Sequence, residues 1–201
     1  MVSVIPADVS TNIPINTAIA IQFSEPLLPE SISKDTVRVI GAAVPIAGTI
    51  ALAEDCRSLV FRPETALASL ANFKVEISGV RDRAGNRLEA PVASHFETSD
   101  AVDVTPPLVR GLDMGMVVAL QFSEPIDPTT ITVKSIRLND VTSGAVVAAT
   151  SVVGATGNVI YLIPSAPLKD GAAYCLTVDC VADLAGNCLD FEIPTCFTPT
   201  E

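Results

Sequence analysis

The pentapeptide QFSEP occurs twice in this chain, at residues 22–26 and 121–125. The residues before it are related as well, because TAIAIQF at 17–23 corresponds to MVVALQF at 116–122. In both segments apolar side chains alternate with other residues, the period-two pattern of a strand with one buried face. A chance repeat would not carry its neighbours' pattern, so we predict that the chain contains two copies of one β unit.

The correspondence extends over nearly the whole of each unit. After the pentapeptide, SLVFRP at 58–63 matches VIYLIP at 159–164. Further on, NFKVEISGVRDRAGNRL at 72–88 matches AYCLTVDCVADLAGNCL at 173–189. The second copy has gained two residues in a loop between the pentapeptide and these segments. The two copies therefore share their hydrophobic pattern as well as the pentapeptide, which indicates a duplication.

Short strands separated by turns are the predicted elements. Val, Ile and Thr recur in short runs, and 15 prolines punctuate them, a mix that favours strands over helices. About seven turn-bounded strands per unit are typical of an antiparallel sandwich of about 100 residues. The predicted fold class is all-β: two tandem antiparallel β-sandwiches at 1–99 and 107–201, joined by a short linker at 100–106 that ends in a proline. We expect 29–35 and 64–70 to be crossover turns.

The charge and hydropathy of the chain exclude two kinds of partner. The net charge is −11 and the pI is about 4.4, so the surface repels phosphate backbones and anionic lipid, and no nucleic-acid partner is expected. No apolar run approaches the roughly 18–20 residues of a membrane helix, so no membrane insertion is expected. The N-terminus shows no signal peptide. We expect either an intracellular protein or a piece of a longer exported one, and the ragged ends favour the second.

A family resemblance follows from the order of the repeated motifs. Each unit carries a strand ending in FSEP, a strand followed by proline (FRP or LIP), an aromatic-led strand, D-x-A-G-N, and a final F-x-T or FT. Matched twice, over roughly 2–99 and 106–199, this order resembles the bacterial Ig-like domains first described in S-layer proteins. The resemblance implies Ig-like sandwiches arrayed in exported or cell-surface proteins as spacers or adhesive modules. It implies no shared enzymatic activity and no universal ligand.

The expected function is that of a non-catalytic tandem Ig-like fragment of a bacterial surface or secreted protein. It would act as a structural spacer or adhesion module, located extracellularly or at the cell surface, with neighbouring domains of a larger surface protein as partners. The alternative is a module that binds carbohydrate, such as cell-wall glycan, or protein through its inter-strand loops. The chain lacks Trp, and most of its seven Phe and two Tyr residues fall at core-type positions, which disfavours a sugar-stacking site.

No enzymatic activity is expected. The sequence has no GxSxG, HExxH, P-loop or dinucleotide-binding fingerprint. Its only histidine, His95, would need Ser94 or Asp82 for a hydrolytic triad. The counterpart of His95 in the second copy is Cys196, and it should lie on the outward face beside buried Phe96, so we interpret it as an exposed strand residue.

The D-x-A-G-N segments at 82–86 and 183–187 are predicted turns, in which the glycine takes a positive φ and the aspartate hydrogen-bonds loop amides. Calcium is the alternative, because Asp and Asn oxygens suit a hard cation, although neither loop has the acid density of an EF-hand. No cofactor is expected otherwise. The calcium candidates are Asp82, Asn86, Asp183 and Asn187, with the linker acids Asp100 and Asp103 for an ion between the domains. Glu25 and Glu124 of the pentapeptides are further candidates.

The five cysteines favour disulfides over a zinc site, because no CxxC pair is present. If Leu176 and Phe197 face the core, Cys175 and Cys196 both face outward on consecutive antiparallel strands, where they can bond. From this parity we predict a Cys175–Cys196 disulfide. We also predict a second disulfide, Cys180–Cys188, at the edges of the loop. This second bond requires either a β-bulge or that both cysteines lie within the loop. Cys56 would remain a lone thiol. Disulfides imply an oxidising compartment.

Overall fold

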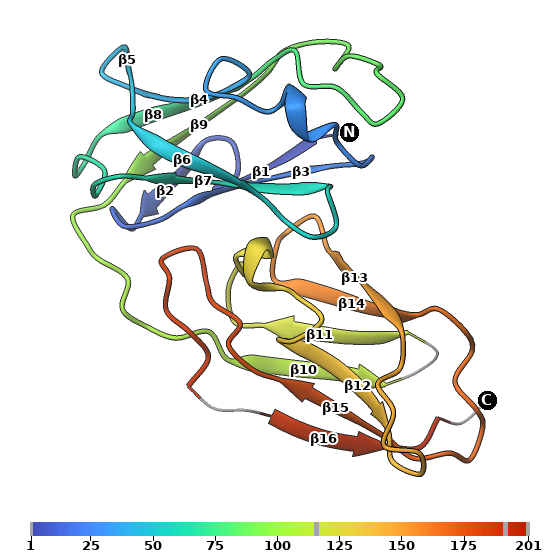
Figure 1. The fold of residues 1–201 in the computed structure, drawn as a ribbon. Coiled ribbons are helices and arrows are strands. Elements are labelled where there is room, and N and C mark those ends of the chain that lie inside the picture. The colour runs from blue at the N-terminus through green and yellow to red at the C-terminus, as the bar shows by residue number, and fades with distance from the viewer. Residues whose placement is uncertain (1, 115–116, 191–192, 200–201) are drawn as a thin grey trace. The chain divides into compact units, whose positions relative to one another are not determined.

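The computed structural model describes residues 2–114, 117–190 and 193–199 (Figure 1). The described residues form strands and two single-turn 3-10 helices, so the predicted all-β class is confirmed. No helix in this part of the chain has the length and apolar character needed to cross a membrane. The chain divides into two compact units, 1–104 and 105–201, a division that falls inside the predicted linker.

The first unit is a sandwich of two sheets, with strand orders β1-β3-β7-β6 and β2-β9-β8-β4-β5. All of its pairings are antiparallel except that of β2 with β9. The 3-10 turn η1 (Pro29–Ser31) lies in a predicted crossover turn. The strands are β1 (Val2–Ile5), β2 (Ser10–Ile13), β3 (Ile19–Phe23), β4 (Val37–Gly41), β5 (Val44–Pro45), β6 (Gly48–Leu52), β7 (Ser58–Pro63), β8 (Asn72–Ile77) and β9 (Val92–Thr98).

The core of the first unit lies between these two sheets. On β8 the buried residues Phe73, Val75 and Ile77 alternate with more exposed ones, as the period-two pattern predicts. The ring of Phe73 stacks on that of Phe96 from β9, with ring centroids 5.4 Å apart. On β8 the alternation therefore sets which face is buried, whereas on β7 the consecutive residues 58–61 are all buried.

The N-terminal segment of the first unit contributes to both sheets. Strand β1 pairs with β3, and β2 then crosses to the other sheet, where it runs parallel to β9. The amide of Val9 donates to the carbonyl of His95 at 2.8 Å, and the amide of Ser99 donates to the carbonyl of Ile13 at 2.8 Å. The outer edge of the last strand is therefore covered by β2.

The second unit is also a two-sheet sandwich, with strand orders β10-β11-β14-β13 and β12-β15-β16, all antiparallel. It contains one 3-10 turn, η2 (Pro128–Thr130). The strands are β10 (Val109–Met114), β11 (Val118–Phe122), β12 (Ile136–Asp140), β13 (Ala149–Val153), β14 (Val159–Pro164), β15 (Tyr174–Val178) and β16 (Ile193–Phe197).

The N-terminal segment is where the two units differ most. In the second unit β10 and β11 pair as a close hairpin, with Met114 opposite Val118, and the described residues include no counterpart of β2. Strand β16 is consequently an edge strand that pairs only with β15 among the described residues. The sequence repeat does not reveal this difference, because it begins to match clearly only at β3 and β11.

We expect the core position Leu176 to determine the stability of the second unit. Leu176 is 1% exposed and packs in the core with Leu120, Leu138 and Ile160, so Leu176→Ala should lower the free energy of unfolding by about 2–5 kcal/mol. The control is Val133→Ala at a site that is 69% exposed, which should change it by less than about 0.5 kcal/mol. Urea unfolding of both variants measures the difference. Equal effects would contradict the assigned core.

Candidate functional site

The two D-x-A-G-N loops form the same hydrogen-bonded turn. In the first unit the backbone amide and the side-chain amide of Asn86 donate to the two carboxylate oxygens of Asp82, at 2.8 and 2.7 Å. In the second unit Asn187 donates in the same way to Asp183, at 2.9 and 2.8 Å. Gly85 and Gly186 both have a positive φ, 88° and 92°, a conformation that glycine adopts without strain.

Loop amides donate hydrogen bonds to both carboxylate oxygens of each aspartate. The side-chain amide of Asn86 is the main cause that lowers the pKa of Asp82 below its usual value. Asp183 is 1% exposed and accepts a further bond from the amide of Ala185 at 2.8 Å. Each carboxylate keeps a further lone pair, so the turn bonds leave calcium binding at these loops a prediction.

Each D-x-A-G-N loop lies beside the repeated pentapeptide of its own unit. Leu27 forms an isolated β-bridge with Asp82, and the amide of Arg83 donates to the carbonyl of Pro26 at 3.1 Å. In the second unit Ile126 bridges to Asp183 in the same way. The two motifs that are repeated most faithfully are thus in direct contact, a pairing that the sequence analysis did not find.

Asp127 is a buried polar residue that the sequence analysis missed. It follows the second pentapeptide and caps η2, where its carboxylate accepts hydrogen bonds from the backbone amide and hydroxyl of Thr129, at 2.8 and 2.6 Å. The D-P-T-T sequence at 127–130 is the available signal, because an aspartate directly before a proline is typical of a capped helical turn.

A hollow of about 360 Å³ lies at the junction of these motifs in the first unit. Apolar side chains contribute to its lining: Val2, Phe23, Leu27, Val80, Leu88 and Ala90. The charged groups around it are Glu25, Arg81, Asp82, Arg87 and Glu89. Arg81 donates to the carbonyl of Gly85 at 2.9 Å, and Asp82 is held in the turn. Within the described residues, the side chains of Glu25, Arg87 and Glu89 have no ion-pair or hydrogen-bond partner.

His95 and Ser94 do not form a catalytic arrangement. Adjacent residues of β9 point to opposite faces, so His95 is exposed and Ser94 is buried in the unit, its hydroxyl without a hydrogen-bond partner. His95 instead lies beside Asp8, with Nδ1 3.4 Å from a carboxylate oxygen. The backbone amide of His95 also donates to Asp8, the main cause that lowers the pKa of this carboxyl.

The linker acids occupy different environments. Asp100 is exposed. Asp103 is anchored by its backbone to Asn16, whose side chain donates to the carbonyl of Asp103 at 2.8 Å and accepts from its amide at 2.9 Å. These two hydrogen bonds from the backbone of Asp103 to the side chain of Asn16 fix the path of the chain at the end of the first unit.

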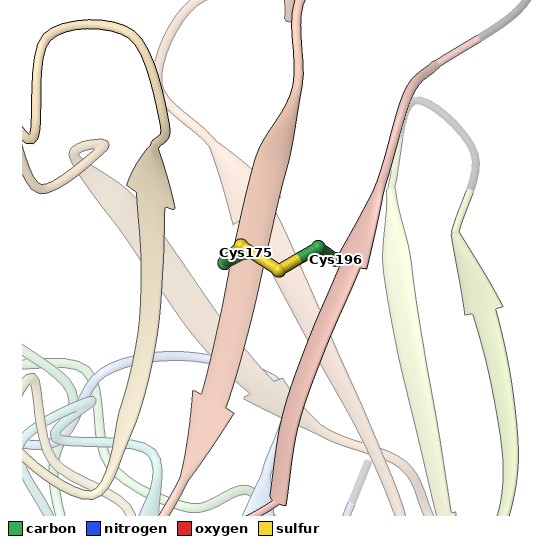
Figure 2. Close-up of a disulfide and its surroundings, with 2 residues drawn as sticks. All are labelled: Cys175 and Cys196. Carbon is green, nitrogen blue, oxygen red and sulfur yellow. A yellow bond between two sulfur atoms is a disulfide. The ribbon is translucent and has the colours of Figure 1, made fainter.

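Figure 2 shows the disulfide between Cys175 and Cys196, which joins β15 to β16. The two residues are directly opposite in the ladder, with Cα atoms 3.9 Å apart, so the pairing predicted from strand parity is confirmed. The predicted Cys180–Cys188 bond is not formed in the structure, where both residues are exposed free thiols. The loop register explains this, because Cys188 lies opposite Ala182 rather than Cys180. Cys56 is also free, and its sulfur accepts a hydrogen bond from Arg83 at 3.2 Å.

Comparison with known proteins identifies relatives of both units. A model of the bacterial Ig-like domain family matches residues 1–98 and 105–198. An S-layer protein of Geobacillus stearothermophilus is 23% identical over 196 residues, which cover 88% of this chain and 16% of that protein. The N-terminal part of the bacterial S-layer protein SbsC is 14% identical, with a TM-score of 0.39 over 99% of this chain and 43% of that one. The copper resistance protein PcoC from Escherichia coli is 20% identical, with a TM-score of 0.39 over 48% of this chain and 96% of that one.

The buried carboxylate of Asp183 should stabilise the second unit. Asp183→Ala leaves the amides of Ala185 and Asn187 without their acceptor, so we expect a loss of about 2–3 kcal/mol in the free energy of unfolding. Asp82→Ala is the matched control in the first unit, where the equivalent carboxylate is more exposed, and its effect should be smaller. Urea unfolding, with hydrogen exchange of residues 181–189, measures both. An Asp183→Ala chain as stable as the wild type would show that these bonds contribute nothing.

Proposed function

Since the chain belongs to the bacterial Ig-like domain family over both of its units, we propose that it is a non-catalytic spacer in a bacterial surface or secreted protein. Neighbouring domains of a larger surface protein would be its partners, and it would lie at the cell surface or outside the cell. The similarity to an S-layer protein supports this location. A disulfide on the surface of the second unit supports an oxidising compartment.

A spacer in a chain of domains transmits tension from its N-terminal to its C-terminal strand. In the first unit these are the segment β1–β2 and strand β9, and β2 runs parallel to β9. Pulling the start of one and the end of the other in opposite directions loads their hydrogen bonds in shear. The hydrogen bonds from Val9 to His95 and from Ser99 to Ile13 then bear the force together rather than breaking one after another.

Among the described residues of the second unit no parallel strand lies beside β16, and the disulfide takes that place. Tension on the C-terminal side would peel β16 away from β15, beginning with Phe197, which lies opposite Tyr174. The next pair along the ladder is Cys175 and Cys196. Peeling therefore stops at a covalent bond after a single residue pair. This is the observation that carries the proposal: each unit secures its terminal strand, one by hydrogen bonds in shear and the other by a disulfide.

Single-molecule stretching between the two ends of the chain tests the spacer function. We expect two unfolding events, and reduction should lower the force of only one of them. The same event should lengthen by about 70 Å, because the bond spans 21 residues at about 3.4 Å each.

Two variants assign the events. Cys175→Ser/Cys196→Ser should reproduce the reduced chain without any reductant, while Asp8→Ala, which removes an acceptor of the His95 amide, should weaken only the other event. Reduction that changes the length but not the force would mean that the disulfide does not hold β16 in place. Units that extend without measurable resistance in either state would exclude the spacer function.

The alternative function, a ligand-binding module, is favoured by the hollow of the first unit. Its apolar lining and its charged groups of both signs supply a surface for a sugar ring together with donors and acceptors for hydroxyls. Its volume lies at the small end of the range for ligand pockets. We infer that a mono- or disaccharide is the ligand class that fits it best, since the mixed charges select neither an anion nor a cation.

Titration with cellobiose and with N,N′-diacetylchitobiose, followed by amide chemical shifts, tests the alternative. If the hollow binds saccharide, shifts should concentrate at residues 23–27 and 80–90, and Arg87→Ala should weaken binding at least tenfold. Arg38→Ala is the control, since Arg38 is exposed on β4 and pairs with Glu76 away from the hollow. An absence of shifts at 20-fold molar excess, or equal binding by both variants, would rule out this use of the hollow.

A further inference from the structure

Cys180 has a backbone conformation that is unfavourable for a residue with a side chain. Its φ is 51°, in the left-handed region, and the corresponding residue of the first unit is Gly79, with φ 74°. Glycine adopts this conformation without the steric cost that a Cβ atom incurs. Cys180 is one of seven described non-glycine residues with a positive φ, and its counterpart in the other unit is a glycine of the same loop.

The second cysteine of the loop, Cys188, takes the place of Arg87 of the first unit. The loop bonds are the same in both units: Leu88 donates to the carbonyl of Val80 at 2.9 Å, and Leu189 donates to that of Val181 at 2.8 Å. The bridge between Arg81 and Arg87 likewise recurs between Ala182 and Cys188. The backbone positions 180 and 188 of the second unit are therefore arranged like positions 79 and 87 of the first.

In the first unit that relation is a direct contact. A Cβ atom placed on Gly79 would lie 3.1 Å from Nη2 of Arg87 and 3.5 Å from its Nε, so the side chain at position 87 passes over position 79. In the second unit positions 180 and 188 thus lie within the reach of one long side chain, and the shorter side chain of Cys188 needs a movement of the loop to reach Cys180. Cys188 is also the smallest of the causes that raise the pKa of Cys180. Both thiols are exposed to solvent.

We propose that Cys180 and Cys188 form a thiol–disulfide exchange site that closes reversibly by reaction with a small disulfide such as oxidised glutathione. This site is separate from the Cys175–Cys196 bond. The substrate class is a low-molecular-weight disulfide, and the product of closure is a second intramolecular disulfide that ties the two ends of the D-L-A-G-N loop together.

The exchange takes place in two balanced steps. The Cys188 thiolate attacks one sulfur of the small disulfide, forms a mixed disulfide and releases one small thiolate, which takes up a proton. The Cys180 thiol then loses its proton to water and attacks the Cys188 sulfur, which releases the second small thiol. Together the two cysteines lose two electrons and two protons, and one small disulfide becomes two thiols.

The effect of Asp179 on the pKa of Cys180 indicates which cysteine reacts first. The thiol of Cys180 donates a hydrogen bond to the carboxylate of Asp179, and this bond is the main cause that raises the pKa of Cys180. A raised pKa lowers the fraction of Cys180 that is present as thiolate. Because the thiolate is the nucleophile in exchange, Cys188 reacts first and Cys180 resolves the mixed disulfide.

The two bonds should differ in how easily they are reduced. Cys175 and Cys196 lie directly opposite in a regular ladder, so their bond closes without any shift of the strands. Cys188 lies opposite Ala182, so bonding to Cys180 requires the loop to move. Exposed disulfides that strain their surroundings are reduced more readily than unstrained ones, which makes the loop bond the labile one.

The experiment uses the intact chain with Cys175–Cys196 formed and the other thiols reduced. Oxidised glutathione is added, the free thiols are alkylated, and non-reducing peptide mapping identifies the bonds. We expect a Cys180–Cys188 linkage with Cys56 alkylated, and recovery of both loop thiols at a dithiothreitol concentration that leaves Cys175–Cys196 intact. Hydrogen exchange at residues 181–187 should slow on oxidation.

Three variants make the outcome decisive. Cys180→Gly, which restores the residue of the first unit, should accumulate glutathione on Cys188, whereas Cys188→Ser should leave Cys180 at least fivefold less modified. Cys56→Ser is the control and should behave as the wild type. Stable glutathione adducts on both loop cysteines of the wild type, a bond from either of them to Cys56, or reduction of both disulfides at the same dithiothreitol concentration would each overturn the proposal.

Discussion

Burial of every second side chain is the constraint on which both units depend. A strand that presents one apolar face must place it against another such face, and two sheets packed together are the smallest arrangement that does so. In the first unit Val75 and Phe96 come from neighbouring strands of one sheet, while Ile19 and Leu59 come from the other, and all four are buried in one core. Turns, caps and disulfides adjust this arrangement but do not create it.

The second constraint is the treatment of strand edges. A sandwich leaves its terminal strands with unpaired backbone groups, and each unit manages its last strand differently. The first covers β9 with β2. The second has a short β10–β11 hairpin instead and fastens β16 covalently to β15. Two units of one family thus share their core pattern but differ at the edge.

Sequence reasoning succeeded where a local periodic signal sets the structure. Alternation placed Leu176 in the core and Cys175 on the surface, and from this parity the Cys175–Cys196 bond followed. It failed where the outcome depends on contacts between distant segments. The crossing of β2 to the second sheet, the bridge from Leu27 to Asp82 and the hollow beside it all require residues more than fifty positions apart to meet. Cys180 and Cys188 show a different limit, because the alternation of a regular strand does not describe a loop whose backbone turns through a positive φ.

The proline of β16 has a consequence for contacts between molecules. Cys175 and Cys196 form the close kind of antiparallel pair, in which the amides of both residues point away from each other. In the unbroken register of this ladder Pro194, opposite Thr177, occupies a site of the same kind, so its nitrogen faces the open edge. A strand from another molecule that approached this edge would find no donor at Pro194, and proline is a common means by which natural sheets prevent edge-to-edge association. The open edge of the second unit therefore carries its own protection against polymerisation, and that protection costs no hydrogen bond inside the fold.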